Sequence, residues 1–139
     1  MNVVDSSGWL EYIANSATAG FFAPAIENVK DLIVPSISLY EVFKRVQLQS
    51  GVDEALKLAG HTMQGRVIEL DAPMALDAAK VSIQFSLPMT DSIVLATARA
   101  HMAILWTQDE HFKGISGVRY IQEAEAGPLG VTPLPVPLP

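Results

Sequence analysis

The sequence predicts an α/β protein of three layers, in which a mostly parallel central sheet has helices on both faces. Short apolar runs alternate along the chain with longer segments of helical periodicity, which is typical of strands joined by helical crossovers. The apolar runs are nearly continuous, as expected for strands buried on both faces. The chain has 139 residues, of which 50% are hydrophobic and 17% charged, so we expect one domain with a sizeable core.

The expected strands and helices follow one another along the chain. The strands cover residues 2–4, 32–34, 67–70, 103–107 and 118–121, and the last of them is expected at an edge. The helices cover residues 7–13, 18–29, 39–49, 52–64, 73–85 and 90–102. Ser6 or Ser7 is the expected N-cap of the first helix, and Thr90 is the expected N-cap of the last. Pro24 falls inside the second helix, where it either bends that helix or marks its first turn. In the fourth helix, the residues expected to face inward are Val52, Ala55, Leu56 and Ala59.

Composition excludes several classes of protein. The absence of cysteine rules out disulfides, thiolate metal sites and a cysteine nucleophile. No apolar run approaches the ~20 residues that span a bilayer, and the N-terminus lacks a basic region, so we expect a cytoplasmic protein without membrane contact. The net charge of −6 argues against a broad nucleic-acid-binding surface. It does not exclude an enzyme that acts on nucleic acid, if bound divalent metal inverts the charge of its active site.

The character of the chain changes near its end. Five of the nine prolines fall in the segment GPLGVTPLPVPLP, which starts at Gly127. Such a segment cannot continue a helix or a central strand. We therefore expect a folded domain over residues 1–122 and a poorly ordered tail over residues 123–139, with a proline-rich docking ligand as the alternative reading of that tail.

Four acidic residues share one position in the predicted fold, since each follows a strand or stands in the first turn of a helix after one. They are Asp5, Glu41, Asp91 and Asp109. A parallel sheet brings all such positions to the same edge. Two carboxylates at about 4 Å repel by about 4 kcal/mol at an effective dielectric constant of about 20, so the cluster needs protons or cations. Oxygen ligands of this kind suit Mg²⁺ or Mn²⁺.

Other polar residues are assigned more weakly. Ser6 and Thr107 stand beside acids of this set and could add hydroxyl contacts to metal, water or phosphate. Lys44 and Arg45 either reach a phosphate or form a solvated helix face. The three histidines show no ligand spacing, so we expect His61, His101 and His111 to be structural or merely exposed. The remaining acids are expected in turns or on solvated faces.

Four segments together resemble a known family. They are VVDSSGWLEY around Asp5, SLYEVFKR around Glu41, LPMTDSIVLATARAH around Asp91 and LWTQDEHF around Asp109. In this order and spacing they resemble the PIN-domain ribonucleases, and among these the VapC-type toxins of toxin–antitoxin pairs. The resemblance covers about residues 1 to 122 and does not explain the proline-rich tail.

The resemblance implies a three-layer PIN-like fold and a metal-dependent endoribonuclease that hydrolyses RNA with metal-activated water. It implies that the four acids form the catalytic and metal-binding set, with Mg²⁺ or Mn²⁺ as cofactor, and that Ser6 and Thr107 match accompanying hydroxyl positions. It also implies a homodimer and a small antitoxin whose peptide wraps the toxin and blocks the site, often with an arginine. Two alternatives stay open: a PIN-type nuclease of RNA processing or decay without an antitoxin, and a receiver-like metal-binding module. The latter would need a lysine after the last strand, and none follows Ile121.

The first two helices carry more large apolar residues than two surface helices usually need. These are Trp9, Tyr12, Ile13, Phe21, Phe22 and Ile26. Either all of them belong to the core, or some form an exposed patch of the kind that marks a protein interface. In the second case, a groove between these helices and the helix of Glu41 would receive an amphipathic antitoxin segment.

Overall fold

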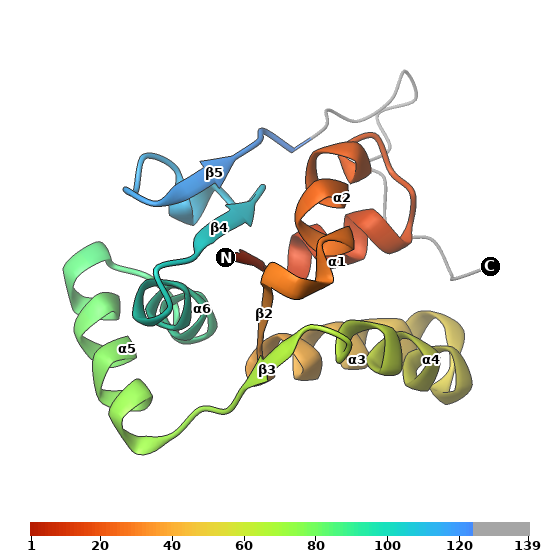
Figure 1. Ribbon diagram of the computed structural model, residues 1–139, viewed down its shortest axis with the longest axis horizontal. Helices are drawn as coiled ribbons and strands as arrows, with labels where there is room; N and C mark the ends of the chain where they lie inside the picture. The colour runs from red at the N-terminus through yellow and green to blue at the C-terminus, as the bar shows by residue number, and fades with distance from the viewer. Residues whose placement is uncertain (124–139) are drawn as a thin grey trace.

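The computed structural model describes residues 1–123, which contain a five-stranded sheet with every neighbouring pair of strands parallel (Figure 1). The strand order is β3-β2-β1-β4-β5. Their bounds are β1 Asn2–Val4, β2 Leu32–Pro35, β3 Arg66–Ile68, β4 Ile104–Thr107 and β5 Val118–Tyr120. The predicted α/β class is confirmed, and the sheet is wholly rather than mostly parallel. The prediction for the proline-rich tail lies outside the described residues.

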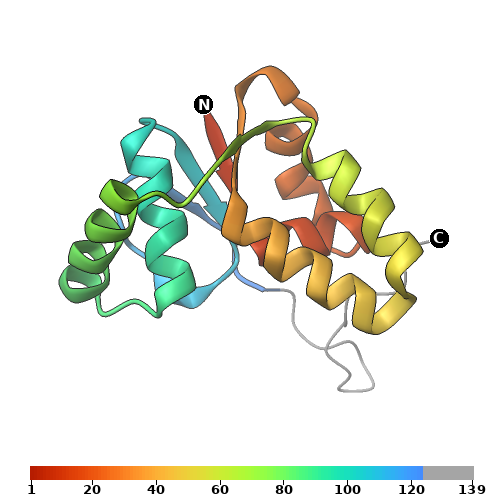
Figure 2. The ribbon, with the colours of Figure 1, turned by 90° about the horizontal axis from the view of Figure 1, so that it is seen from below.

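Helices cover both faces of this sheet (Figure 2). They are α1 Ser6–Ile13, α2 Ala19–Glu27, α3 Ser36–Ser50, α4 Val52–Thr62, α5 Ala72–Phe85 and α6 Met89–Ala100, with short 3-10 helices η1 Val29–Asp31 and η2 Glu110–Phe112. Successive strand residues point to opposite faces, so Val3 packs in a core with α5 and α6, and Val4 packs in a second core with α1 to α4. None of the helices formed by residues 1–123 combines the length and the apolar character that a bilayer crossing requires.

Two helices begin directly after a proline, which corrects the predicted helix starts. Pro35 ends β2 and is the N-cap of α3, and Pro88 is the N-cap of α6. Proline has a fixed φ and no amide hydrogen, so a helix can start at the next residue without losing a bond. Glu41 therefore lies in the second turn of α3 rather than the first, and Thr90 lies inside α6 and is not its cap.

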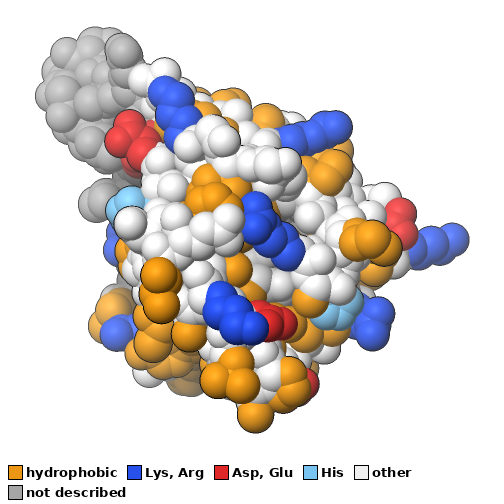
Figure 3. All heavy atoms as spheres, turned by 90° about the vertical axis from the view of Figure 1, so that its left-hand side faces the viewer, with side chains coloured by type: hydrophobic (Ala, Val, Ile, Leu, Met, Phe, Trp, Pro, Cys, Tyr) orange, Lys and Arg blue, Asp and Glu red, His pale blue; other side chains and the backbone are white. Residues whose placement is uncertain are grey.

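The predicted inward face of α4 was partly wrong. Val52 and Leu56 are 49% and 58% exposed, whereas Ala55 and Leu58 are buried. The helix turns one edge of its apolar stripe toward solvent because its main packing partner is the single helix α3. On the other side of the sheet, α5 is the leftmost helix of Figure 1 and faces the viewer in Figure 3, where hydrophobic side chains gather toward the lower part of the surface.

The large apolar residues of α1 and α2 mostly belong to the core. Trp9, Phe22 and Ile26 are at most 2% exposed, and the ring of Phe21 packs against that of Trp106 with their centroids 5.2 Å apart. The helices approach closely at Gly8, where an added Cβ would lie 2.6 Å from side-chain atoms of both Phe22 and Val4. Of the two alternatives, membership of the core is therefore confirmed for Trp9, Phe22 and Ile26, because α1 and α2 close over the sheet.

Candidate active site

The strand register places Asp5 beside Thr107. Val4 of β1 lies opposite Trp106 of β4, so the next residues along each strand meet at the carboxyl end of the sheet. The hydroxyl of Thr107 donates to Oδ2 of Asp5 at 2.5 Å. Asp5 is also the N-cap of α1, since its Oδ1 accepts from the backbone N–H of Gly8 at 3.0 Å and from the hydroxyl of Ser7 at 2.7 Å. Ser7 therefore supports the cap and does not form it.

Asp5 is buried, being only 5% exposed. Burial raises the pKa of its carboxyl group from 3.8 to about 6, although the three hydrogen bonds just described lower it and the charge of Asp109 raises it further. Burial is the largest cause, so a positive charge at this edge of the sheet would stabilise the ionised form of Asp5.

Asp109 follows β4 by two residues and is fixed by local hydrogen bonds. Its backbone N–H donates to the hydroxyl oxygen of Thr107 at 2.9 Å, so the same hydroxyl bridges Asp5 and Asp109. The side chain of Asp109 is the N-cap of η2, where Oδ1 accepts from the N–H of His111 at 2.9 Å. These bonds keep the carboxylate of Asp109 at the carboxyl end of β4.

Asp91 lies in the first turn of α6, and the imidazole ring of His111 lies between Asp91 and Asp109. Nδ1 of His111 lies 2.9 Å from Oδ2 of Asp91 and 3.1 Å from Oδ1 of Asp109. Partial burial raises the pKa of Asp91, and the charges of Asp109 and Glu41 raise it further, while His111 lowers it. The pKa of His111 is raised, first by the charge of Asp109 and next by the hydrogen bond to Asp91. One ligand atom from each of these three residues lies within 4.8 Å of the other two.

Glu41 reaches the same edge from the second turn of α3. Its Oε1 accepts from the hydroxyl of Ser6 at 3.0 Å, which ties α3 to the start of α1. Its charge is among the causes of the raised pKa of Asp91, so it also acts on the space between Asp91 and Asp109. The structure therefore brings the four predicted acids to one edge, with Asp91 and Asp109 closest to a shared ligand position and Asp5 and Glu41 beside them.

His111 is a residue of this site that the sequence analysis missed. It is exposed as expected, but its ring lies between two carboxylates, where a cation would be most stabilised. The contact with Asp91 spans 20 positions along the chain and depends on the tight turn of η2, so no ligand spacing marks it. The signal available in the sequence was its place two residues after Asp109. His101 and His61 lie outside this group, and the ring of His101 bonds the carbonyl of Thr97.

Gln108 separates two site residues but turns into the protein. It is 6% exposed, its Nε2 donates to Glu11 at 3.1 Å and its Oε1 accepts from Thr18 at 3.0 Å. Glu11 belongs to α1 and Thr18 is the N-cap of α2. This buried network anchors the end of β4 to the α1–α2 hairpin and so supports Thr107 and Asp109 from behind.

Lys44 and Arg45 are exposed one turn after Glu41 on α3. Together with Glu41 and three neighbours they line a hollow of about 310 Å³. The cations therefore border the acidic group, and they do not lie within it.

The donor atoms fit a divalent metal ion. Asp91 and Asp109 bring carboxylate oxygens close together, and these are ligands that Mg²⁺ and Mn²⁺ prefer. Burial, the first cause of the raised pKa of Asp5 and of Asp91, disfavours their ionised forms, and a bound cation would offset that effect. Fold and site together define a class: a parallel α/β protein with an acidic, metal-competent group at the carboxyl edge of its sheet.

The chain belongs to the PIN domain family, since the sequence model of the PIN domain matches residues 3–118. Solved structures of similar fold include a toxin–antitoxin complex from Klebsiella pneumoniae, with a TM-score of 0.73 and 20% identity over 86% of this chain and 96% of that one. The Mycobacterium tuberculosis toxin VapC20, described as cleaving the sarcin–ricin loop, gives a TM-score of 0.68 and 16% identity over 84% and 95% of the two chains. DNA-bound VapBC from Salmonella typhimurium gives 0.67 and 14% identity over 88% and 98%. No curated protein matched the sequence.

Proposed function

We propose that this protein is a metal-dependent endoribonuclease and the toxin of a toxin–antitoxin pair. The observation that carries the proposal is the meeting of Asp91, Asp109 and His111 within 4.8 Å, beside Asp5 and Glu41, on a PIN-domain sheet. Membership of the PIN domain family and the likeness to solved toxins support it. RNA as substrate, self-association into a homodimer and a cytoplasmic location belong to the same proposal.

The four acids and the two hydroxyl residues beside them have different roles in this mechanism. Asp91 and Asp109 would hold Mg²⁺ or Mn²⁺, with Asp5 and Glu41 supplying further negative charge. When bound, the metal ion polarises the phosphodiester and lowers the pKa of an attacking water molecule. Thr107 fixes the carboxylate of Asp5 and the backbone of Asp109 at once, and Ser6 fixes Glu41. The chain itself therefore orients the acids before substrate arrives, which removes reorganisation from the reaction step.

The test is cleavage of RNA by purified variants. Asp91→Asn and Asp109→Asn should each abolish cleavage while the proteins stay folded, because amide oxygens bind divalent metal far more weakly than carboxylates. Asp77→Asn is the matched control, since Asp77 is exposed on α5 and outside the acidic group. EDTA should stop cleavage by the wild type, and Mg²⁺ or Mn²⁺ should restore it. Cleavage that persists in Asp91→Asn, or in EDTA, would refute the assignment.

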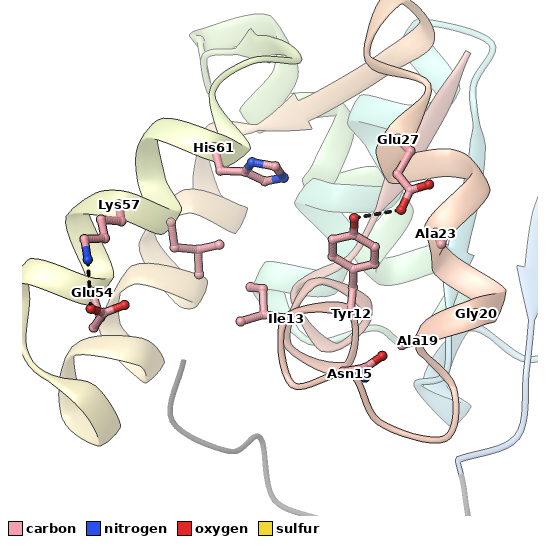
Figure 4. A pocket seen from close by; sticks show the side chains of 11 residues that line it. Tyr12, Ile13, Asn15, Ala19, Gly20, Ala23, Glu27, Glu54, Lys57 and His61 are labelled. Atoms are coloured by element: carbon pink, nitrogen blue, oxygen red, sulfur yellow. Dashed lines mark hydrogen bonds and ion pairs between the residues drawn. The ribbon is translucent and has the colours of Figure 1, made fainter. Parts of the chain in front are cut away.

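The proposed antitoxin would dock where α1 and α2 face α4. There a hollow of about 630 Å³ opens between the α1–α2 pair and α4, with Tyr12 and Ile13 on one side and Lys57 and His61 on the other (Figure 4). This position differs from the groove predicted against the helix of Glu41. Small residues on the α2 wall let a helix approach closely; they are Ala19, Gly20 and Ala23. An amphipathic antitoxin helix would place its apolar side chains in this hollow.

Gly20 offers a clean test of this docking site. An added Cβ at Gly20 meets nothing within 4 Å, so Gly20→Arg would fill the hollow without disturbing the fold. Gly60→Arg is the matched control, because Gly60 is equally open on α4 but does not line the hollow. We expect Gly20→Arg alone to lose co-purification with the product of the neighbouring short reading frame while retaining RNA cleavage. If both variants bind that partner as the wild type does, the partner does not use this hollow. If no such reading frame exists, RNA processing or decay without an antitoxin becomes the better interpretation.

A further inference from the structure

The outer face of α3 carries an exposed aromatic ring next to the acidic group. Tyr40 is 60% exposed, although most large aromatic side chains of the described chain are buried or half-buried. It lies beside Glu41 and borders the hollow of about 310 Å³ between α1 and α3. The lining residues of this hollow are Leu10, Tyr40, Glu41, Lys44, Arg45 and Leu48. Glu41 therefore belongs both to this hollow and to the edge of the sheet where the acids meet.

The cations of this hollow are available for a ligand. Lys44 and Arg45 are exposed, and among residues 1–123 neither forms an ion pair with a carboxylate. The chain has a net charge of −6 and only nine lysines and arginines. Two adjacent cations within one turn of Glu41 therefore give this hollow a locally positive potential on a protein that is negative as a whole. A polyanion that approaches the acidic group needs nearby cations of this kind, because the carboxylates repel its phosphates.

The ring and one cation are already arranged together. Nζ of Lys44 lies 5.7 Å from the centroid of the Tyr40 ring, a cation–π distance that holds the ammonium group next to the aromatic face. Exposed aromatic faces stack nucleobases, and adjacent cations bind the phosphates that follow those bases along a single strand. Tyr40 with Lys44 and Arg45 supplies both contacts for one nucleotide.

We propose that this hollow is a subsite for a nucleotide of single-stranded RNA that flanks the bond to be cleaved, and this rests on the proposed function. Tyr40 stacks the base, and Lys44 and Arg45 bind its phosphates, while Leu10 and the exposed Leu48 add apolar contacts. Two cations without a carboxylate partner in residues 1–123, beside an aromatic ring, favour a polyanionic strand as the occupant, although Leu10, Leu48 and Glu41 also line the hollow. Because every base has a stacking face, the subsite provides affinity and register rather than sequence choice.

Binding is measured by fluorescence anisotropy with a short, labelled single-stranded RNA of mixed sequence. All variants are made in the Asp91→Asn background, so that the probe is not cleaved. Tyr40→Leu should weaken binding about tenfold, whereas Tyr40→Trp should preserve it, since stacking needs an aromatic ring and not merely an apolar side chain. The exposed Ile83 of α5 provides the control variant Ile83→Ala, which should bind as the parent does.

The charge contacts are tested by the salt dependence of the same binding. Lys44→Ala should lower the slope of log affinity against log salt by about 0.7, the amount expected for one phosphate contact on a single strand. Lys80→Ala on α5 removes the same charge from an exposed position on the other side of the sheet and should leave the slope nearly unchanged.

The outcomes separate this proposal from the proposed function. If the otherwise wild-type protein cleaves RNA but Tyr40→Leu and Lys44→Ala bind the probe as the parent does, the subsite is refuted and the nuclease assignment stands. Equal losses in Tyr40→Leu and Tyr40→Trp would also refute base stacking. If the otherwise wild-type protein cleaves no RNA at all, the proposed nuclease function is refuted, and with it a subsite that flanks a cleaved bond. An unchanged RNA affinity combined with lost partner binding would assign the hollow to a protein instead.

Discussion

Replacing Asp5 by asparagine should make the metal-free protein more stable at neutral pH, although Asp5 belongs to the proposed active site. The buried carboxyl group has a pKa of about 6 instead of 3.8. The folded state therefore favours the protonated form. The stability that this preference contributes is fully present below pH 3.8 and is lost as the pH rises through about 6. Asparagine stays neutral and has no such loss.

The size of the effect follows from two opposing contributions. A shift of about two pKa units corresponds to about 3 kcal/mol, which is the gain from removing the buried charge well above pH 6. Against this, a hydrogen bond is lost. In the wild type the hydroxyl of Thr107 donates to Oδ2 of Asp5 and accepts from the N–H of Asp109. In Asp5→Asn the amide NH₂, itself a donor, takes the place of Oδ2. The hydroxyl proton then loses its acceptor, which costs about 1–2 kcal/mol. The net gain near pH 7.5 is about 1–2 kcal/mol.

The assay is urea unfolding of both proteins in EDTA between pH 4 and pH 8. Near pH 4 the variant should be the less stable protein, because the hydrogen-bond loss remains and the charge relief is small. Above pH 6 it should be the more stable one, so the difference in free energy of unfolding should change sign in between. Equal destabilisation of Asp5→Asn at both ends of the pH range would refute the raised pKa and the reasoning built on it.

Three further changes test the surroundings of the site. Gly8→Ala should destabilise the protein by about 1–3 kcal/mol in urea unfolding, because its Cβ would lie 2.6 Å from Phe22 and Val4. Phe22→Ala should cost about 3–5 kcal/mol and lower the melting temperature, since Phe22 is fully buried and is not a partner anchor. Thr107→Val keeps the shape but removes both hydrogen bonds of the hydroxyl, so we expect at least a tenfold loss of kcat in RNA cleavage, with a stability loss of about 1–3 kcal/mol.

The sequence predicted the fold and the acidic edge for a physical reason. Strands buried on both faces leave continuous apolar runs, and a residue that follows such a run must lie at the carboxyl edge of a parallel sheet. Asp5 and Asp109 satisfy that rule directly. Glu41 was placed at the correct edge through an incorrect helix start, because the distance along α3 from Pro35 is short enough for a second-turn side chain to reach the same space.

Contacts between distant segments could not be predicted in the same way. His111 reaches Asp91 only because η2 folds back toward α6, a geometry that no periodic pattern encodes. The burial of Phe22 depends on the absence of a side chain at Gly8, which lies in another helix. In α4 the apolar stripe is wider than the surface available to cover it, so periodicity alone did not separate Leu56 from Leu58.

The buried amide of Gln108 restricts how the segment WTQDEHF can vary. Its side chain donates to a carboxylate and accepts from a hydroxyl, and an amide is the group that can do both at this length. Gln108→Glu would face the carboxylate of Glu11 with a second negative charge, and Gln108→Leu would remove the bonds at 3.0 and 3.1 Å and leave only the longer bond from Thr18 to Glu11 at 3.4 Å. Tolerance to substitution at this position should therefore be as low as at Asp109, although the amide turns away from the acidic group toward Glu11 and Thr18. Intolerance to mutation in this segment therefore does not identify catalytic residues by itself. A mutational scan of activity must be compared with the free energy of unfolding measured independently for each variant.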